Sequence, residues 1–226
     1  MSENPFENIN YLDFHTHKMR RQSEANISEI VSIHLGKETE HSLYTIGKHP
    51  WWTEEVLSKE ELNTLTLHLS SEHCLAMGEM GLDKFKGPEL SKQIEILKSQ
   101  LVLANALKKP VIIHCVRAFD QLIQIKKEFP HIPNWCIHGF SRHPELAKQL
   151  IHQGFYISLI PVLQPTEKYK TLLTSLPLDR FFLETDSMPN ISIENIYLQA
   201  AKILNISVET LIKQINKNAI TFFNHE

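Results

Sequence analysis

Five apolar runs of this chain end in, or are followed by, side chains that bind metal ions. In chain order these side chains are Asp13, His15 and His17, then Glu79, His114, His138 and Asp186. The carboxyl ends of parallel strands meet at one edge of a sheet or one mouth of a barrel, so we expect the side chains to lie together. Imidazoles and carboxylates form the mixed nitrogen and oxygen ligand sets that divalent cations accept. The pattern therefore predicts a centre for two divalent metal ions.

The spacing also divides the ligands between the two ions. His15 and His17 are two residues apart on a strand, so their side chains point to the same side. Asp186 follows the last strand, which is the neighbour of the first strand in a closed barrel, and it is expected to complete this set. His114 and His138 end consecutive strands and are expected to hold the second ion.

A carboxylate between the two ions completes the predicted centre. Glu79 has two oxygens and is expected to bridge the ions. Two cations about 3.5–4 Å apart hold a hydroxide and neutralise charge on the group that it attacks, and Asp186 is expected to orient this hydroxide or to take its proton. We therefore predict a hydrolase with Mg²⁺, Mn²⁺ or Zn²⁺ as cofactor and with Asp186 and Glu79 as catalytic residues. The sequence contains neither a Gly-x-Ser-x-Gly nucleophile motif nor a Walker phosphate loop.

Alternating strand and helix patterns predict the elements that position these residues. Eight strands are expected near 11–16, 29–35, 43–48, 74–79, 110–115, 134–139, 155–159 and 180–185, and helices at 88–107, 118–129, 144–153, 166–175, 192–204 and 207–223. Eight βα units with right-handed crossovers predict one α/β domain over residues 1–226, a (β/α)₈ TIM-like barrel. About a dozen residues separate the first two strands, so we expect the barrel to be distorted there, with no full helix between them.

Composition excludes several other classes of protein. The 226 residues include 23 basic and 26 acidic ones, and the net charge of −3 argues against a protein that coats nucleic acid through a broad basic face. No apolar run approaches the ~20 residues that span a membrane, and the N-terminus lacks the pattern of a secretory signal. The three cysteines form no Cys-x-x-Cys pair and are expected to be buried, reduced thiols. We expect a cytoplasmic monomer.

Short motifs along nearly the whole chain occur in a characteristic order. They are Asp-x-His-x-His at 13–17, Gly-Lys-His-Pro at 47–50, Gly-Glu-Met-Gly-Leu-Asp at 78–83, His-Gly-Phe-Ser at 138–141 and Glu-Thr-Asp at 184–186. In this order they resemble the TatD family of metal-dependent hydrolases, in the amidohydrolase-like barrel superfamily. The resemblance implies the same six metal ligands. It also implies phosphodiester hydrolysis, with 3′–5′ exonuclease-like trimming of DNA in the cytoplasm.

Three residues near the predicted ligands could bind the substrate, either a DNA end or a small phosphodiester. His49 is interpreted as a contact to a substrate phosphate or as a packed loop residue. Arg117 and Arg142 are suited to phosphate contacts, although exposed loop cations are common without such a role, and the same two interpretations apply to Lys48. A small-molecule amidohydrolase or lactonase with the same dinuclear site is the alternative function. A non-catalytic partner-binding protein would be expected to have lost a ligand.

Other residues near the motifs have two interpretations each. Asp13 either orients a histidine from behind or bonds to local backbone. Asp83 either supports a ligand or caps a helix, and Glu184 fits a buried partner of a loop or histidine better than a third ligand. Trp51 and Trp52 either stack on a base or cover the edge of the core.

Overall fold

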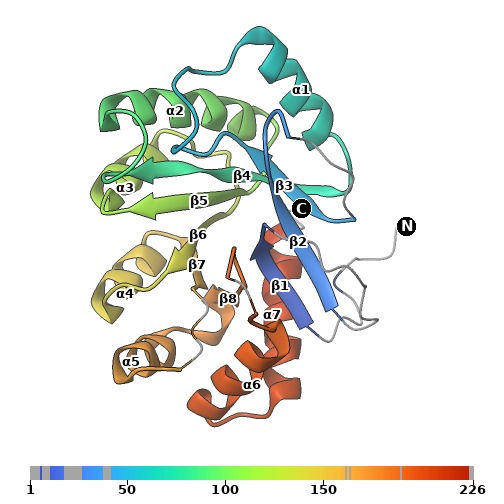
Figure 1. Ribbon diagram of the computed structural model, residues 1–226, viewed down its shortest axis with the longest axis vertical. Helices are drawn as coiled ribbons and strands as arrows, with labels where there is room; N and C mark the ends of the chain where they lie inside the picture. The colour runs from blue at the N-terminus through green and yellow to red at the C-terminus, as the bar shows by residue number, and fades with distance from the viewer. Residues whose placement is uncertain are drawn as a thin grey trace. The chain divides into compact units, whose positions relative to one another are not determined.

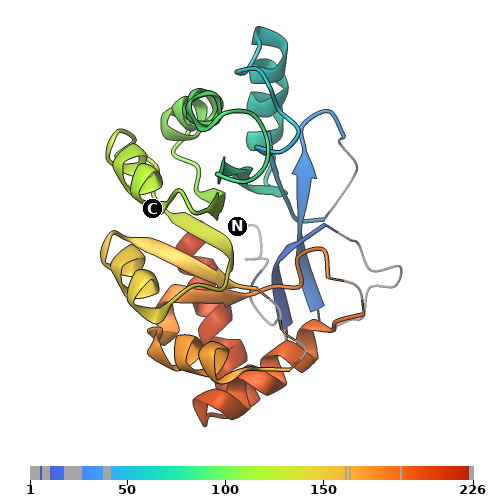
Figure 2. The ribbon, with the colours of Figure 1, turned by 60° about the vertical axis from the view of Figure 1, so that its left-hand side comes forward.

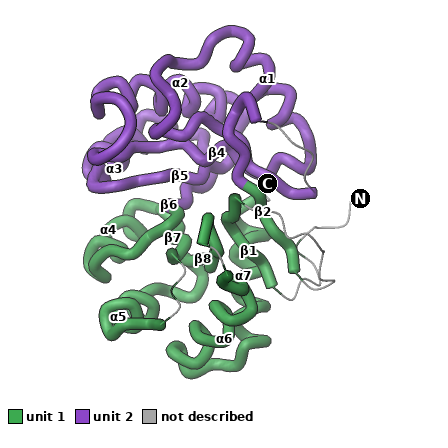
Figure 3. The backbone as a smooth tube through the Cα atoms, viewed as in Figure 1, with its two compact units in different colours: residues 1–31, 138–226 green, residues 32–137 purple. Residues whose placement is uncertain are grey.

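The computed structural model describes residues 6, 11–17, 27–37, 42–160, 162, 164–188 and 190–223 (Figures 1 and 2). Its chain forms two compact units, one of residues 1–31 and 138–226 and the other of residues 32–137 (Figure 3). We refer to them as unit 1 and unit 2. Eight strands belong to one sheet in chain order, β1 to β8. Strand β2 (Ile27–His34) and strand β6 (Trp135–Phe140) each contain residues of both units.

Unit 2 alternates strands and helices. The order is β3 (Tyr44–Gly47), α1 (Lys59–Leu69), β4 (Cys74–Asp83), α2 (Leu90–Ala106), β5 (Val111–Val116) and α3 (Phe119–Lys127). Strand β4 is buried at nine of its ten positions, and residues Val111 to Ile113 of β5 are buried without a break. Such continuously apolar strands suit a parallel sheet that is covered on both faces.

Unit 1 contains the first and last strands. They are β1 (Tyr11–Thr16), β7 (Phe155–Leu159) and β8 (Phe181–Leu183), together with helices α4 (Pro144–His152), α5 (Glu167–Ser175), α6 (Ile193–Leu204) and α7 (Val208–Phe223) and a 3₁₀ turn at Leu178–Arg180. Helix α7 packs against β1 and β8, and α4 against β7 (Figure 1). The centre of this packing is a stack of the Phe14 and Phe182 rings, 3.9 Å apart, which the edge of Phe222 from α7 contacts.

A bridge between Thr16 and Asp186 joins the end of β1 to the residues after β8. With the strand order β1 to β8, this bridge gives the connectivity of a (β/α)₈ barrel, and the predicted fold class is confirmed. Each of the eight predicted strands overlaps an observed one, and the six named helices are all present within two residues at each end.

Three details differ from the prediction or lie outside it. Strand β4 continues to Asp83, so Glu79 lies inside the strand, at a shift of register between Met77 and Met80, and not at its end. Helix α1 was not among the named helices, although Ser58 and Glu61 form a complete capping box at its start. The prediction names no helix between β2 and β3, and the described residues there contain none. The crossover from β1 to β2 falls on residues 18–26, outside the described residues.

Candidate metal centre

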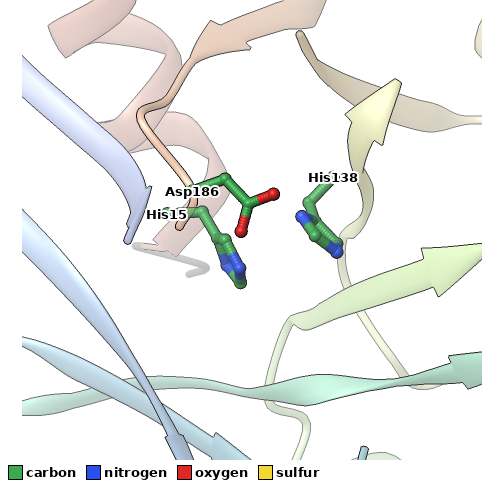
Figure 4. A group of neighbouring side chains, drawn as sticks. All are labelled: His15, His138 and Asp186. Carbon is green, nitrogen blue, oxygen red and sulfur yellow. The ribbon is translucent and has the colours of Figure 1, made fainter. Parts of the chain in front are cut away.

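Unit 1 brings His15, His138 and Asp186 together. One ligand atom of each lies within 4.8 Å of the other two, and the side chains come from β1, from β6 and from the turn after β8 (Figure 4). Both imidazoles are buried, and their rings lie 4.2 Å apart. Two imidazoles and a carboxylate are a donor set that suits Zn²⁺ or Mn²⁺. By its chemistry this group fits a divalent cation.

The backbone around Asp186 holds this residue against β1. The Asp186 N–H donates to the His15 carbonyl over 2.9 Å, and the His17 N–H donates to the Asp186 carbonyl over 3.2 Å. The exposed His17 joins the group, because its Nε2 lies 3.3 Å from Nε2 of His15 and 3.5 Å from Oδ1 of Asp186. The three predicted ligands of the first ion are therefore neighbours in unit 1.

Asp13 supports the turn that carries Asp186. Its carboxylate accepts hydrogen bonds from the Thr185 N–H over 2.8 Å and from the Thr185 hydroxyl over 2.5 Å. Burial raises the pKa of Asp13 to about 7, although both Thr185 bonds act in the opposite direction. These contacts fit neither interpretation from the sequence, because Thr185 is neither a histidine nor local in the chain. Asp13 contributes by fixing the residue that precedes a predicted ligand.

Glu184 lies behind His138 and is completely buried. Its Oε1 accepts the Gly139 N–H over 2.8 Å and lies 3.4 Å from Nδ1 of His138, while Oε2 accepts the Ser158 hydroxyl. A carboxylate on one ring nitrogen fixes the orientation of a histidine and leaves the other nitrogen for a metal. The interpretation of Glu184 as a buried partner is confirmed. Ser158 was given no role from the sequence.

Unit 2 contains a second group, made of His49, Glu79 and His114. Glu79 Oε1 lies 2.9 Å from Nε2 of His49 and 2.9 Å from Nδ1 of His114. The Trp51 N–H donates to Nδ1 of His49 over 3.1 Å, so the proton of a neutral His49 is on Nε2 and is donated to Glu79. His49, predicted to contact substrate phosphate, is thus placed to orient Glu79.

Asp83 lies beside the ring nitrogen of His114 that faces away from Glu79. Its Oδ2 accepts from the Trp51 indole over 2.7 Å and lies 3.2 Å from Nε2 of His114, while Oδ1 accepts the Phe85 N–H over 2.8 Å. Burial raises the pKa of Asp83, but these hydrogen bonds outweigh it and hold the pKa below its usual value. The helix-cap interpretation of Asp83 is wrong, because the next helix, α2, has Glu89 as its N-cap.

The donors of His49, Glu79 and His114 could hold a cation in unit 2. When the proton of a neutral His114 is on Nε2, towards Asp83, the ring presents an unprotonated Nδ1 to Glu79. Two acceptors that face each other at 2.9 Å need a cation or a further proton between them. The group therefore fits a divalent ion by the chemistry of its donors. Whether His114 and His138 hold one ion, and whether Glu79 bridges two ions, stay predictions, because these residues belong to different units.

The predicted substrate cations have different surroundings. Lys48 is buried, and its ammonium group bonds to Glu61 over 2.7 Å and to the Glu55 carbonyl over 3.1 Å. Arg117 is exposed directly after β5, and Arg142 is half-buried two residues after β6. Lys48 is therefore committed to an ion pair, whereas Arg117 and Arg142 remain candidates for phosphate contacts.

Residues 19–224 match the family of TatD-related DNases. The chain belongs to this family. Among its relatives is an uncharacterized metal-dependent hydrolase of Buchnera aphidicola, which is 31% identical over 70% of this chain and 63% of its own length. The chain thus spans about three fifths of the curated relatives that it matches. The family match begins after His15 and His17, so these two predicted ligands lie outside the matched residues.

Solved structures of the family have the same fold. The TatD homologue YJJV of Escherichia coli superimposes with a TM-score of 0.81 at 22% identity, over 96% of this chain and 99% of that one. A TatD family hydrolase of Entamoeba histolytica superimposes with a TM-score of 0.77 at 16% identity, over 95% and 98% of the two chains. In the described residues, no helix is long and apolar enough to cross a membrane.

Proposed function

We propose that this member of the TatD family is a metal-dependent phosphodiesterase that removes nucleotides from the end of a DNA strand. The observation that carries the proposal is the pair of donor groups, His15–His138–Asp186 in unit 1 and His49–Glu79–His114 in unit 2. The first combines two imidazoles with a carboxylate, and in the second Glu79 and His114 offer donor atoms while His49 holds Glu79 in place. The family's description as TatD-related DNases and the description of the Buchnera relative as a metal-dependent hydrolase support the reaction class.

Two divalent cations, Mg²⁺, Mn²⁺ or Zn²⁺, are the proposed cofactors. When bound, such ions lower the pKa of water and neutralise charge on the phosphate. His15, His17 and Asp186 would hold one ion and His114 and His138 the other, with Glu79 between them. The carboxylate partners Glu184 and Asp83 would keep His138 and His114 in the tautomers that bind metal.

Asp186 is the proposed proton acceptor. Its backbone is fixed to β1 by hydrogen bonds with His15 and His17, so its carboxylate has a defined position. From that position it would orient the attacking water and receive its proton. Glu79 is held by the His49 ring and is expected to be essential for turnover. Arg117 and Arg142 are the proposed phosphate contacts, because a guanidinium group binds phosphate oxygens in pairs.

The proposed compartment is the cytoplasm. The three cysteines form no disulfide and are buried, and burial raises the pKa of the Cys74 thiol to about 12. Unreactive buried thiols are usual in reducing compartments, where disulfides do not persist. We also propose that the chain acts as a monomer.

A cleavage assay tests the proposed reaction. Metal-stripped protein is incubated with an end-labelled single-stranded DNA oligonucleotide while Mg²⁺, Mn²⁺ or Zn²⁺ is titrated. His114→Ala is compared with His131→Ala, a control at an exposed histidine of the same unit. Metal-dependent shortening from one end, lost in the first variant and kept in the control, is expected.

Stoichiometric metal binding without any cleavage would contradict the phosphodiesterase proposal. In that case the small-molecule amidohydrolase or lactonase would be the better account of the same donor groups. The assay then continues with small amide and lactone substrates and the same two variants.

A further inference from the structure

Two large aromatic side chains of unit 2 are exposed next to the donor group. Trp52 is 60% exposed and follows β3, and Phe85 is 74% exposed and follows β4. Single exposed apolar residues are common, so the surroundings of these two rings decide whether they mark a ligand site. Trp51, beside Trp52 in the sequence, is different, because its indole donates to Asp83 and its ring packs against His114.

The loops that carry the two exposed rings are fastened to each other. The Trp51 indole donates to Asp83 over 2.7 Å, and the ammonium group of Lys86 lies 4.0 Å from the centre of the Trp51 ring. A Cβ at Gly87 would overlap the carbonyl oxygen of Pro50, so the two backbones are in close contact. Trp52 and Phe85 are therefore presented by a rigid framework although their own rings are exposed.

Trp52 is in direct contact with the donor group. Its ring lies 4.6 Å from the His49 ring at an angle of 33°, and 5.6 Å from the His34 ring at 87°. The same His49 ring donates to Glu79 through Nε2. Only the Trp52 ring would then separate a stacked aromatic ligand from His49. His49 in turn orients Glu79, the proposed bridging carboxylate.

Exposed cations surround Phe85. Lys84 and Lys86 flank it in the sequence, and both are exposed. The Lys84 N–H donates to the Val116 carbonyl over 3.1 Å, which places this loop beside the end of β5, where the exposed Arg117 follows. Cations that alternate with exposed aromatic rings are the arrangement by which proteins bind single-stranded nucleic acid. The cations contact phosphates, and the rings stack on bases.

We propose that Trp52 and Phe85 stack on unpaired bases at the end of a DNA strand, while Lys84, Lys86 and Arg117 contact its phosphates. This inference rests on the proposed phosphodiesterase function and adds how the substrate is recognised. Stacking is tolerant of base identity, because every base has a π-face. The enzyme would accept any sequence but would require bases that are not paired.

A binding measurement tests the stacking residues apart from catalysis. Fluorescein-labelled single-stranded DNA is titrated with protein in Mg²⁺, and all proteins carry His114→Ala so that the DNA stays intact. Trp52→Ala and Phe85→Ala are each expected to weaken binding by about 5- to 150-fold, the equivalent of ~1–3 kcal/mol per stacked base. Trp52→Phe keeps most of the affinity, because it keeps a ring. Leu67→Ala is the matched control, since Leu67 is 76% exposed on α1 in the same unit.

A second probe separates stacking from phosphate binding. An oligonucleotide of equal length with abasic sites has the same phosphates and no bases, so it should bind more weakly, and Trp52→Ala should not weaken it further. Equal affinity of the Trp52→Ala and His114→Ala proteins for normal DNA would overturn the proposal. Equal cleavage of normal and abasic DNA by the wild-type protein would overturn it too, while the phosphodiesterase function would stand. Binding that depends on Trp52, without cleavage in any metal, would support the stacking site and contradict the proposed reaction.

Discussion

Replacing Asp83 by Asn tests how the unit 2 donor group is protonated. Asp83 accepts hydrogen bonds at both carboxylate oxygens, from the Phe85 N–H at Oδ1 and from the Trp51 indole at Oδ2, where Nε2 of His114 also lies. A carboxamide has only one oxygen. If that oxygen serves Phe85, the amide NH₂ faces two N–H donors, and the His114 proton moves to Nδ1. That nitrogen is the one that faces Glu79 and is expected to bind metal.

The expected loss can be worked out from the contact that disappears. A hydrogen bond with a charged acceptor contributes about 1.5–3 kcal/mol, and removing the outer partner of a metal-binding histidine costs about 10- to 100-fold in metal affinity. At 1.4 kcal/mol per factor of ten, the two ranges agree. Metal-stripped Asp83→Asn and wild-type protein are titrated with Zn²⁺ or Mn²⁺ in a calorimeter. The variant should bind one of its two metal ions about 10- to 100-fold more weakly than the wild type does.

The control for this variant is Trp51→Phe. It removes the indole donor but leaves the carboxylate and its bond to His114, so metal affinity is expected to change less than about threefold, because the outer partner of the histidine is kept. Thermal melts of both variants without metal check that folding is kept. Unchanged affinity of Asp83→Asn for both equivalents would refute the idea that Asp83 sets the tautomer of His114.

Three further predictions concern other parts of the molecule. Glu184→Gln should lower metal affinity about 10- to 100-fold through His138 and stability by about 1–3 kcal/mol, as measured by calorimetry and urea unfolding. Burial raises the pKa of Glu61, but bonds from Lys48 and the helix cap outweigh it and lower the pKa overall. The wild type should then exceed Glu61→Gln in stability by about 1 kcal/mol at neutral pH, and melts should show this difference vanishing as the pH falls from about 4.3 through the folded-state pKa. Phe14→Ala removes the ring stacked in the centre of unit 1 and should cost about 3–5 kcal/mol in urea unfolding.

The fold could be predicted because several of its strands are continuous apolar runs in the sequence. Runs such as Val111 to Ile113 and Phe181 to Leu183 are apolar throughout, as expected for strands buried on both faces. Helix starts at Pro144 and Ser192 follow the usual chemistry of first turns. Helix α1 was not named because its apolar pattern is weak, with only Leu65 and Leu69 buried, although its capping box was visible.

The course of β4 past Glu79 could not be predicted. Gly78 and Gly81 surround Glu79, and glycines normally argue against a continuing strand. In the structure a Cβ at Gly81 would overlap the His114 backbone, and one at Gly78 would overlap Ile112. The glycines are needed because β4 and β5 approach closely on both sides of Glu79. This close approach is a tertiary feature that a local pattern does not contain.

The residues that come together in the donor groups could be predicted from their types and positions, but the contacts of their ring nitrogens could not. In both units a buried carboxylate lies beside one nitrogen of a histidine, Asp83 at 3.2 Å from Nε2 of His114 and Glu184 at 3.4 Å from Nδ1 of His138. Asp83 is the last residue of β4, four residues after Glu79, and Glu184 directly follows β8, two residues before Asp186. From the sequence alone Asp83 could be the support of a ligand or a helix cap, and Glu184 fits a buried partner better than a third ligand. The role of each carboxylate depends on its distance from a ring nitrogen of the histidine. That distance is set by the packing of neighbouring strands, which the sequence does not show.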